Sequence, residues 1–428
     1  MHVLFISNYF PPEVNAPANR LYEHARQWAR DGGSLEVLTA VPNFPEGAVY
    51  DGYRNRLTKE TIEGIPVTRV PMYIAENRGT FRRTISYISF MLTAIWYART
   101  LDRQPDLVVA SSPQFFSGLA GYVISRWRRV PFVLEVRDLW PDSIVAVGAS
   151  KRNWLIRLFE KLEMYLYRHS THIVTVTESF KRVIAGKGID ERKITVLKNG
   201  ADLEGFGKDP DTNKLAELRR LYGLEGKFVA AYIGTLGMAH RADILLQAAA
   251  RCQDPEIVFM VIGAGAERDQ LARLQEESGL KNFRLLPKQS REVVPYFLAL
   301  ADVCVVHLKD APLFRTVIPS KMFEAMVMGK PIALGIRGEA AEIVTEAEAG
   351  ICFAPEDADD LVKVVEDLQR DQVLYRRLSE NGRNYVARHH DRKDLARRYW
   401  ALLLTIGQDA EVITAKGGKV NARGNALG

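Results

Sequence analysis

Short apolar runs alternate along the chain with longer segments in which apolar residues recur every three or four positions. The short runs, rich in Val and Ile, predict buried strands, and the longer segments predict amphipathic helices. This alternation is typical of parallel βαβ units with helices on both faces of the sheet. The strands predicted in the first half of the chain cover residues 3–7, 35–39, 67–70, 107–110, 132–136, 173–177 and 195–197.

A second series of apolar runs predicts a separate α/β domain after a polar interruption. Residues 199–213 are rich in Gly, Asp, Asn and Pro and have no apolar period, which predicts an interdomain linker. We therefore expect an α/β protein with two Rossmann-like, doubly wound parallel sheets that face a cleft, because open sheets bind ligands beyond the carboxyl ends of their strands. The strands predicted beyond the linker cover residues 228–233, 257–262, 283–286, 303–306, 331–334 and 351–353.

The same pattern predicts the domain boundaries. We expect an N-terminal domain over residues 1–203, a second domain over 204–390, a C-terminal helix over 391–415 that packs back on the first domain, and a disordered tail over 416–428. The tail prediction rests on a high content of Gly and Asn and on a near lack of apolar residues.

Composition and charge narrow the class of protein. The 428 residues are 47% hydrophobic and 26% charged, as in folded globular proteins, which excludes a mainly disordered chain. The net charge of +6 is too small for this length to predict nucleic-acid binding. Residues 1–200 carry 27 basic and 19 acidic side chains, whereas residues 201–428 carry 31 and 33. We expect the basic half to meet an anionic surface or ligand.

Neither disulfides nor a membrane span is predicted. The three cysteines are isolated and odd in number, which favours a reducing compartment. Residues 1–7 resemble a first strand rather than a signal peptide. The apolar run at residues 85–98 is shorter than the roughly 20 residues that span a bilayer. We therefore expect a cytoplasmic protein.

Three strand-to-helix loops carry candidate binding chemistry. After the first strand, Asn15 is placed to cap a helix whose N-terminus could receive a phosphate or a sugar hydroxyl, or that is simply an ordinary capped loop. In the second domain the glycines of residues 234–237 and the nearby Arg241 could cradle a diphosphate. The loop lacks the Gly-Lys-Ser/Thr ending of a Walker A motif, so nucleoside triphosphate hydrolysis is not expected.

The third loop holds half of a dinucleotide fingerprint. Gly263 and Gly265 follow a strand, but Arg268 occupies the place of the third glycine. As a signal for NAD this is weak, and its plain interpretation is a tight strand-to-helix turn against which a nucleotide base could pack.

The most informative segment covers residues 315–331. Pro319 and Gly329 bracket a short helix in which Lys321 and Glu324 lie on one face near the N-terminus. A cation beside free backbone N–H groups can hold a diphosphate, and a carboxylate can accept hydrogen bonds from both ribose hydroxyls. The alternative is a surface ion pair worth about 0.3 kcal/mol.

Four motifs together resemble a known family. These are residues 319–331 (PSKMFEAMVMGKP), the loop at 234–237 (GTLG), residues 196–202 (VLKNGAD) and the opening loop at 11–20 (PPEVNAPANR). They closely resemble retaining family-4 glycosyltransferases of the GT-B fold, in particular those of the WbuB and WcaI type, which act in bacterial O-antigen, capsule and colanic acid assembly. The resemblance extends over residues 1–405 and does not identify the sugar.

The resemblance implies that the second domain binds a nucleotide-sugar donor and the first domain an acceptor. Glu324 would bind the ribose, the cations and glycine backbone would hold the diphosphate, and Gly263 and Lys288 would border the base. The residues implied for catalysis are Asp138, Arg137, Lys321 and Arg241. Those implied for substrate binding are Asn15, Ala16, Gly234, Thr235, Leu236, Gly237, Gly263, Lys288, Arg315, Pro319, Ser320 and Glu324.

The chain departs from the general family pattern in three places. The first acid of the family's E-x7-E pair is replaced by Thr316, which puts recognition of the donor-sugar hydroxyls in doubt. The usual strand-end His is Arg137, and the Gly-Gly of the first loop is Asn15-Ala16. The WbuB-like members share these features, so we interpret them as tuning within the subfamily.

The expected chemistry needs no metal and no cofactor. Fixed dipoles with Lys321 and Arg241 could stabilise the leaving diphosphate, and the acceptor could attack from the same face, with Asp138 as base or orienting group. The Asp-x-Asp matches at 209–211 and 357–359 are interpreted as chance because one lies in the linker and the other at a helix start.

By resemblance, the donor is a UDP-sugar rather than a GDP-sugar and the acceptor an undecaprenyl-diphosphate-linked saccharide. Basic amphipathic segments near residues 82–98, 126–129 and 154–167 predict peripheral association with an anionic membrane. The resemblance implies that this membrane is the bacterial inner membrane, at its inner face. Three alternatives stay open: a GT-B-fold UDP-sugar 2-epimerase, a non-catalytic sugar-nucleotide-binding assembly partner and, more distantly, a nicotinamide dehydrogenase.

Overall fold

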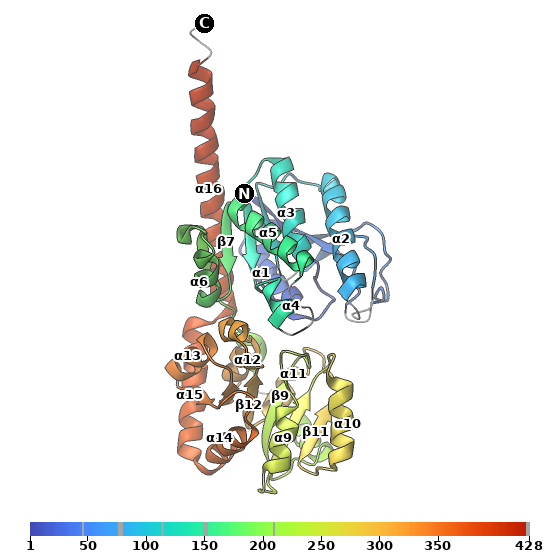
Figure 1. Ribbon diagram of the computed structural model, residues 1–428, viewed down its shortest axis with the longest axis vertical. Coiled ribbons are helices and arrows are strands. Elements are labelled where there is room, and N and C mark those ends of the chain that lie inside the picture. Colours follow the sequence, from blue (N-terminus) through green and yellow to red (C-terminus); the bar gives the residue numbers. More distant parts are fainter. Residues whose placement is uncertain are drawn as a thin grey trace. The chain divides into compact units, whose positions relative to one another are not determined.

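The computed structural model describes residues 1–44, 47–75, 80–112, 115–146, 148, 153–208 and 210–424 (Figure 1). The chain forms two compact units. The first contains Met1–Leu197 together with the C-terminal segment from Lys393, and the second contains Lys198–Arg392. The sequence placed these junctions at 203/204 and 390/391.

The first unit is built on an eight-stranded sheet of order β3-β4-β2-β1-β5-β6-β7-β8. All neighbouring strands are parallel except β3, which pairs antiparallel with β4 at the edge. The strands are β1 (His2–Ile6), β2 (Ser34–Ala40), β3 (Thr58–Ile62), β4 (Ile65–Val70), β5 (Leu107–Ser111), β6 (Phe132–Val136), β7 (His172–Thr175) and β8 (Ile194–Val196).

Helices cover this sheet, and the longest comes from the far end of the chain. The principal helices are α1 (Ala16–Arg30), α2 (Thr80–Tyr97), α3 (Phe115–Arg128), α4 (Asp142–Ala146), α5 (Trp154–His169), α6 (Glu178–Gly186) and α16 (Arg392–Gly424). The indole N–H of Trp28 in α1 donates to the carbonyl of Ala396 in α16 at 2.7 Å, and the ring of Trp28 meets that of Tyr399 edge-on. These aromatic contacts attach α16 to the core of the first unit.

The second unit holds a six-stranded, entirely parallel sheet of order β11-β10-β9-β12-β13-β14. Its strands are β9 (Phe228–Ile233), β10 (Ile257–Ile262), β11 (Phe283–Leu286), β12 (Val303–His307), β13 (Ile332–Gly335) and β14 (Gly350–Cys352). Its helices are α7 (Leu203–Phe206), α8 (Thr212–Leu221), α9 (Ile244–Arg251), α10 (Arg268–Ser278), α11 (Val294–Leu300), α12 (Lys321–Val327), α13 (Glu339–Glu346), α14 (Ala358–Arg370) and α15 (Gln372–His389). The prediction of two doubly wound parallel α/β sheets is confirmed.

Three local predictions are corrected by the structure. Strand β3 was missed because TKETI has only one strongly apolar residue, as suits an exposed edge strand. The predicted linker is instead part of the second unit: Asp202 caps α7, and the carbonyl of Gly200 accepts hydrogen bonds from the guanidinium of Arg392. Helix α16 continues to Gly424, through most of the predicted disordered tail.

Candidate functional site

Two loops at the carboxyl edge of the second sheet cross at very close range. The backbone N–H of Leu236, after β9, donates to the carbonyl of Ala264, after β10. A Cβ atom on Gly263 would lie 1.9 Å from the carbonyl oxygen of Gly234, and one on Gly265 would lie 2.2 Å from that of Leu236. These two glycines are therefore required by loop packing. Loop packing alone thus explains why the partial dinucleotide-binding motif is present. The nicotinamide dehydrogenase alternative, which depended on that motif, has no other supporting feature.

Lys321 occupies the space left by the glycine after β9. Its Nζ atom is buried, has no hydrogen-bond partner and lies 3.4 Å from the centroid of the Tyr232 ring. A Cβ atom on Gly234 would come within 3.2 Å of that nitrogen. Burial lowers the pKa of Lys321 to about 7, although the charges of Glu324 and Cys304 oppose the shift. A buried ammonium without a partner is an arrangement that an anionic ligand would complete.

Glu324 lies one helical turn from Lys321, among basic side chains. Burial raises the pKa of its carboxyl, while the positive charges of Arg392, Arg291 and Lys321 lower it. Arg392 comes from a segment that is hydrogen-bonded to residues 199–201 of the second unit. The tertiary structure therefore places near Glu324 a basic side chain that lies far from it in the sequence. The sequence pair Lys321 and Glu324 is thus placed at one edge of the sheet, as expected.

Arg241 is held in an ion-pair network. Its Nε and Nη2 atoms donate to the two carboxylate oxygens of Asp243 at 3.0 and 3.1 Å, and Nη1 donates to Glu356 at 2.7 Å. Its backbone adopts a positive φ of 45°. Binding of a diphosphate by Arg241 stays a prediction. Its guanidinium N–H groups already donate to the carboxylates of Asp243 and Glu356, so a diphosphate would compete with these carboxylates for them.

Two histidines at this edge were missed by sequence reasoning. The Nδ1–H of buried His307, in β12, donates to the carbonyl of His240 at 3.0 Å, and its Nε2 accepts the N–H of Glu356 at 2.9 Å. This pattern makes His307 a neutral imidazole that fixes the loop after β9. His240 lies in that loop directly before Arg241, and burial lowers the pKa of its imidazole to about 3 against a hydrogen bond with the backbone of Gly237. The one feature of the sequence that could have identified His240 as a candidate is its position in the glycine-rich loop after β9.

The remaining predicted donor residues lie at or near the same edge. Arg315 donates to Asp310 at 3.2 Å, and the hydroxyl of Thr316 donates to the carbonyl of Leu313 at 2.6 Å, so that hydroxyl is engaged locally. Leu236 is buried, whereas Thr235 and Lys288 are exposed. Pro319 and Ser320 directly precede α12, and the carbonyls of both accept hydrogen bonds from its first turn.

In the first unit the structure brings the opening loop to the end of β6. The side-chain oxygen of Asn15 accepts the N–H of Ala18 at 2.9 Å, as predicted for a helix cap. The Nη2 of Arg137 donates to the carbonyl of Ala16 at 3.2 Å, and its backbone N–H donates to the hydroxyl of Ser112 at 3.0 Å. Asn15, Ala16 and Arg137 are therefore neighbours.

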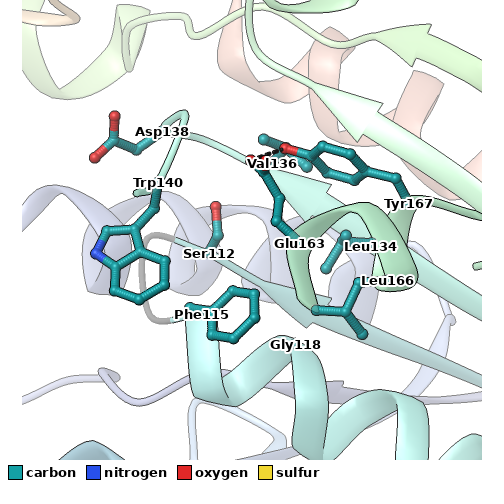
Figure 2. Close-up of a pocket in the computed structure, with 10 residues that line it drawn as sticks. All are labelled: Ser112, Phe115, Gly118, Leu134, Val136, Asp138, Trp140, Glu163, Leu166 and Tyr167. Atoms are coloured by element: carbon teal, nitrogen blue, oxygen red, sulfur yellow. Dashed lines mark hydrogen bonds between the residues drawn. The ribbon is translucent and has the colours of Figure 1, made fainter. Parts of the chain in front are cut away.

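Asp138, next to Arg137 in the chain, is one of the residues that line a pocket formed by β5, β6, α3 and α5 (Figure 2). Burial raises the pKa of Asp138, against hydrogen bonds from the hydroxyl of Ser143 and the N–H of Leu139. Figure 2 shows Asp138 and Trp140 across the pocket from Glu163 and Tyr167. The pocket is lined by Ser112, Phe115, Gly118, Leu134, Val136, Asp138, Trp140, Glu163, Leu166 and Tyr167.

The pocket is mainly apolar, and its deep carboxylate is already satisfied. Glu163 accepts the hydroxyl of Tyr167 at 2.7 Å and the ammonium of Lys187 at 2.9 Å. The ring of Trp140 stacks on that of Phe115 with centroids 4.9 Å apart. The carboxyl of Asp138 accepts hydrogen bonds from the hydroxyl of Ser143 and the N–H of Leu139 instead of an ammonium.

Glu13 was also missed as a candidate, although it lies in the quoted opening motif. It is buried, and its Oε1 accepts the backbone N–H groups of Asn43 at 3.0 Å and Phe44 at 2.9 Å. Burial raises the pKa of Glu13 to about 7 despite these hydrogen bonds. The carboxylate thus ties the β1–α1 loop to the loop after β2, which positions the loop that carries Asn15.

The acidic side chains and the apolar helices bear on the predictions about a metal and a membrane. Within the described ranges, no three His, Cys, Asp or Glu side chains are grouped as a metal site would require. Asp357 caps α14 by accepting the N–H groups of Asp359 and Asp360, whereas Asp209 lies outside the described residues. Among the described helices, none combines the length and the apolar character that crossing a bilayer requires.

Sequence models of two families match the chain. The model described as a glycosyl transferase 4-like domain matches residues 15–200, and the model described as glycosyl transferases group 1 matches residues 216–385. The two matches cover the two structural units in order.

Known proteins with these features are similar along most of the chain. The Escherichia coli K12 glycosyl transferase WcaI, assigned to colanic acid biosynthesis, is 21% identical over 411 residues, or 93% of this chain and 98% of WcaI. An Escherichia coli enzyme named UDP-Gal:alpha-D-GlcNAc-diphosphoundecaprenol alpha-1,3-galactosyltransferase is 27% identical over 72% of this chain and 77% of its own.

Among solved structures, Anabaena Alr3699/HepE in complex with UDP and glucose superposes with a TM-score of 0.72 at 18% identity, covering 95% of this chain and all of that one. WaaG, a glycosyltransferase of lipopolysaccharide biosynthesis, superposes with a TM-score of 0.66 at 15% identity, covering 93% of this chain and 98% of WaaG. Both likenesses concern the fold.

Proposed function

The chain belongs to the family-4 glycosyltransferases of the GT-B fold, and on that premise we propose that it moves a hexose or N-acetylhexosamine-type sugar from a UDP-sugar to a lipid-linked saccharide, with retention of configuration, in bacterial surface polysaccharide synthesis. One observation carries the donor half of this proposal: the buried, unpartnered Nζ of Lys321 beside Gly234 and Glu324. The names of the similar proteins, which include a diphosphoundecaprenol acceptor and bound UDP, support the substrate classes.

In the proposed reaction the acceptor hydroxyl attacks the anomeric carbon from the face of the leaving group. The bond from that carbon to the diphosphate oxygen breaks as the new glycosidic bond forms, and the hydroxyl proton passes to the departing phosphate. Lys321 stabilises the charge that develops on the diphosphate, because an ammonium in a water-excluded site acts far more strongly than one in water. No protein nucleophile is required.

The first unit supplies the acceptor side. Asp138 orients the acceptor hydroxyl, whose proton passes to the departing phosphate. Arg137, fixed against the carbonyl of Ala16, and Asn15 are assigned to binding the sugar that is transferred.

Calorimetric titration with UDP and GDP in the presence of EDTA tests the donor site. We expect UDP to bind without added metal and GDP to bind more weakly. Incubation with UDP-sugars and a diphosphoundecaprenol-linked saccharide then tests transfer. Sugar interconversion without acceptor would instead favour the 2-epimerase, and tight binding of UDP without any turnover would favour a non-catalytic assembly partner.

We further propose that the first unit binds an anionic membrane through α2, α3 and α5. Helix α2 packs against α3 and α3 against α5, so the three form a row (Figure 1). Their exposed side chains mix aromatic and basic groups: Trp96 is 59% exposed, and the guanidinium of Arg99 lies 4.2 Å from the Trp96 ring centroid and 5.7 Å from that of Trp127. Indole and guanidinium groups favour the headgroup layer.

Replacing both exposed indoles tests this surface. We expect the W96A/W127A variant to lose about tenfold or more in its partition onto vesicles that contain phosphatidylglycerol, because two large apolar side chains no longer enter the interface. Cosedimentation measures the partition. The V373S variant, altered at an apolar residue of α15 in the second unit that is more exposed than either indole, is the control. Equal partition of all three proteins would contradict the assignment of this surface.

A further inference from the structure

A buried ion pair joins α1 to β6 in the first unit. Nε of Arg20, in α1, donates to Oε1 of Glu135, in β6, at 3.2 Å, and the two side chains are only 7% and 3% exposed. The second carboxylate oxygen of Glu135 accepts the hydroxyl of Ser111, in β5, at 2.6 Å. Nη2 of Arg20 donates to the carbonyl of Leu197 at 3.1 Å. The pair therefore connects α1 with two neighbouring strands and with the residue at which the chain leaves the first unit.

Stability alone is a weak reason for a protein to keep a buried ion pair. Both charged groups give up their hydration, and their mutual attraction repays this cost only where the geometry and the surrounding hydrogen bonds are good. Replacing such a pair by apolar side chains is often neutral or even stabilising. A hydrogen-bonded polar network does, however, hold the elements that it joins in one arrangement. This pair is therefore better explained by a need to place something than by a need for stability.

The same two elements are joined a second time, through a residue assigned to the transferred sugar. Nη2 of Arg137 donates to the carbonyl of Ala16 at 3.2 Å. Arg137 follows Glu135 by two positions, and Ala16 precedes Arg20 by four positions, about one turn of α1. The two links thus close a ring, with the buried ion pair on one side and the guanidinium of Arg137 on the other.

The backbone between the two links is also anchored. The N–H of Ser112 donates to the carbonyl of Glu135 at 2.8 Å, and the hydroxyl of Ser112 accepts the N–H of Arg137 at 3.0 Å. Tyr399, from α16, lies in the same region: burial raises the pKa of its hydroxyl, the charge of Glu135 adds to the shift, and the charges of Arg20 and Arg137 oppose it. A change in the ion pair would therefore be passed on to Arg137.

We propose that Glu135 and Arg20 are positioning residues for sugar transfer, because their ion pair sets the place of the Arg137 guanidinium. This inference rests on the proposed function, since Arg137 is assigned there to binding the transferred sugar. A displacement of about 1 Å in a group that positions a substrate can slow a reaction about 100-fold. The nucleotide is assigned to the second unit, so loss of the pair should lower kcat and leave the binding of UDP unchanged.

The R20M/E135M variant of the full chain removes both charges and fills the space with apolar side chains. We expect kcat for transfer from a UDP-sugar to a diphosphoundecaprenol-linked saccharide to fall by about 100-fold. The Kd for UDP should equal that of the wild type, and the unfolding temperature should stay within about 4 °C of it. The control R397M/D31N removes an exposed ion pair that joins α16 to α1 at 3.4 Å and should leave kcat unchanged.

A double-mutant cycle with R137A tests whether the pair acts through Arg137. In the R137A background we expect R20M/E135M to lower kcat by less than about threefold, because the guanidinium that the pair places is already gone. E135Q keeps the shape of the side chain and removes only its charge, so it disturbs the fold least. We expect E135Q to lower kcat less than R20M/E135M does, and R137A to suppress that loss as well.

Wild-type kcat in folded R20M/E135M, or in E135Q if the double variant does not fold, would show that this inference is wrong while the proposed function stands. Equal losses of kcat with and without Arg137 would contradict it too, as would a Kd for UDP that rises as much as kcat falls. Absence of transfer by the wild type from any UDP-sugar would instead overturn the proposed function.

Discussion

The E324A variant is expected to lose about 100-fold or more in kcat/KM for the UDP-sugar. In the proposed donor site the carboxylate accepts hydrogen bonds from both ribose hydroxyls, and each bond to a charged acceptor is worth about 1.5–3 kcal/mol. Removing it also leaves the positive charges of Arg291, Arg392 and Lys321 without the carboxylate that lies among them. Steady-state transfer kinetics and UDP calorimetry measure the two effects.

The controls for this experiment separate charge, shape and folding. E324Q keeps the shape and one acceptor, so it should lose less affinity than E324A. E277A removes an exposed glutamate of α10 and should behave as the wild type. Thermal unfolding confirms that each variant is folded. Unchanged kinetics in a folded E324A protein would show that the ribose lies elsewhere.

The K321M variant is expected to move activity and stability in opposite directions. Transfer should fall by about 100- to 1000-fold, because a charge-stabilising donor for the leaving diphosphate is lost. The unliganded protein should become more stable, with the unfolding temperature of the second unit raised by about 2–4 °C, since a buried ammonium without a partner is replaced by an apolar side chain of similar length.

The sign of the stability change follows from the lowered pKa. Burial brings the pKa of Lys321 to about 7, below its value in the unfolded chain, so between these values only the unfolded chain holds the proton and the folded state is disfavoured as the pH falls. The gain in K321M should therefore be larger at pH 7 than at pH 10. K363M is the control: Lys363 is an exposed lysine of α14 in the same unit, so its loss should neither stabilise the protein nor affect transfer. A K321M protein with wild-type transfer would contradict the site.

The fold was predictable from the sequence because its signals are local. Buried parallel strands are continuous apolar runs, and each of the six runs predicted in the second unit is a strand. The edge strand β3 escaped because a half-exposed strand has no such run. The segment around Gly200 was misassigned for a different reason: its polar residues resemble a linker, yet its backbone pairs with residues 390–392, far along the chain.

Sequence alone determined the two-sheet architecture, the loops at the strand ends and the pairing of Lys321 with Glu324, since each depends on residues close together in the chain. Only the tertiary structure decided which polar side chains are already hydrogen-bonded within the protein and which are left to bind a ligand. It engaged Arg241 with Asp243 and Glu356, used Gly263 and Gly265 for a loop crossing, and left the buried Nζ of Lys321 without a hydrogen-bond partner. Burial and hydrogen-bond satisfaction depend on contacts between segments distant in sequence, and those contacts set the chemistry of each side chain.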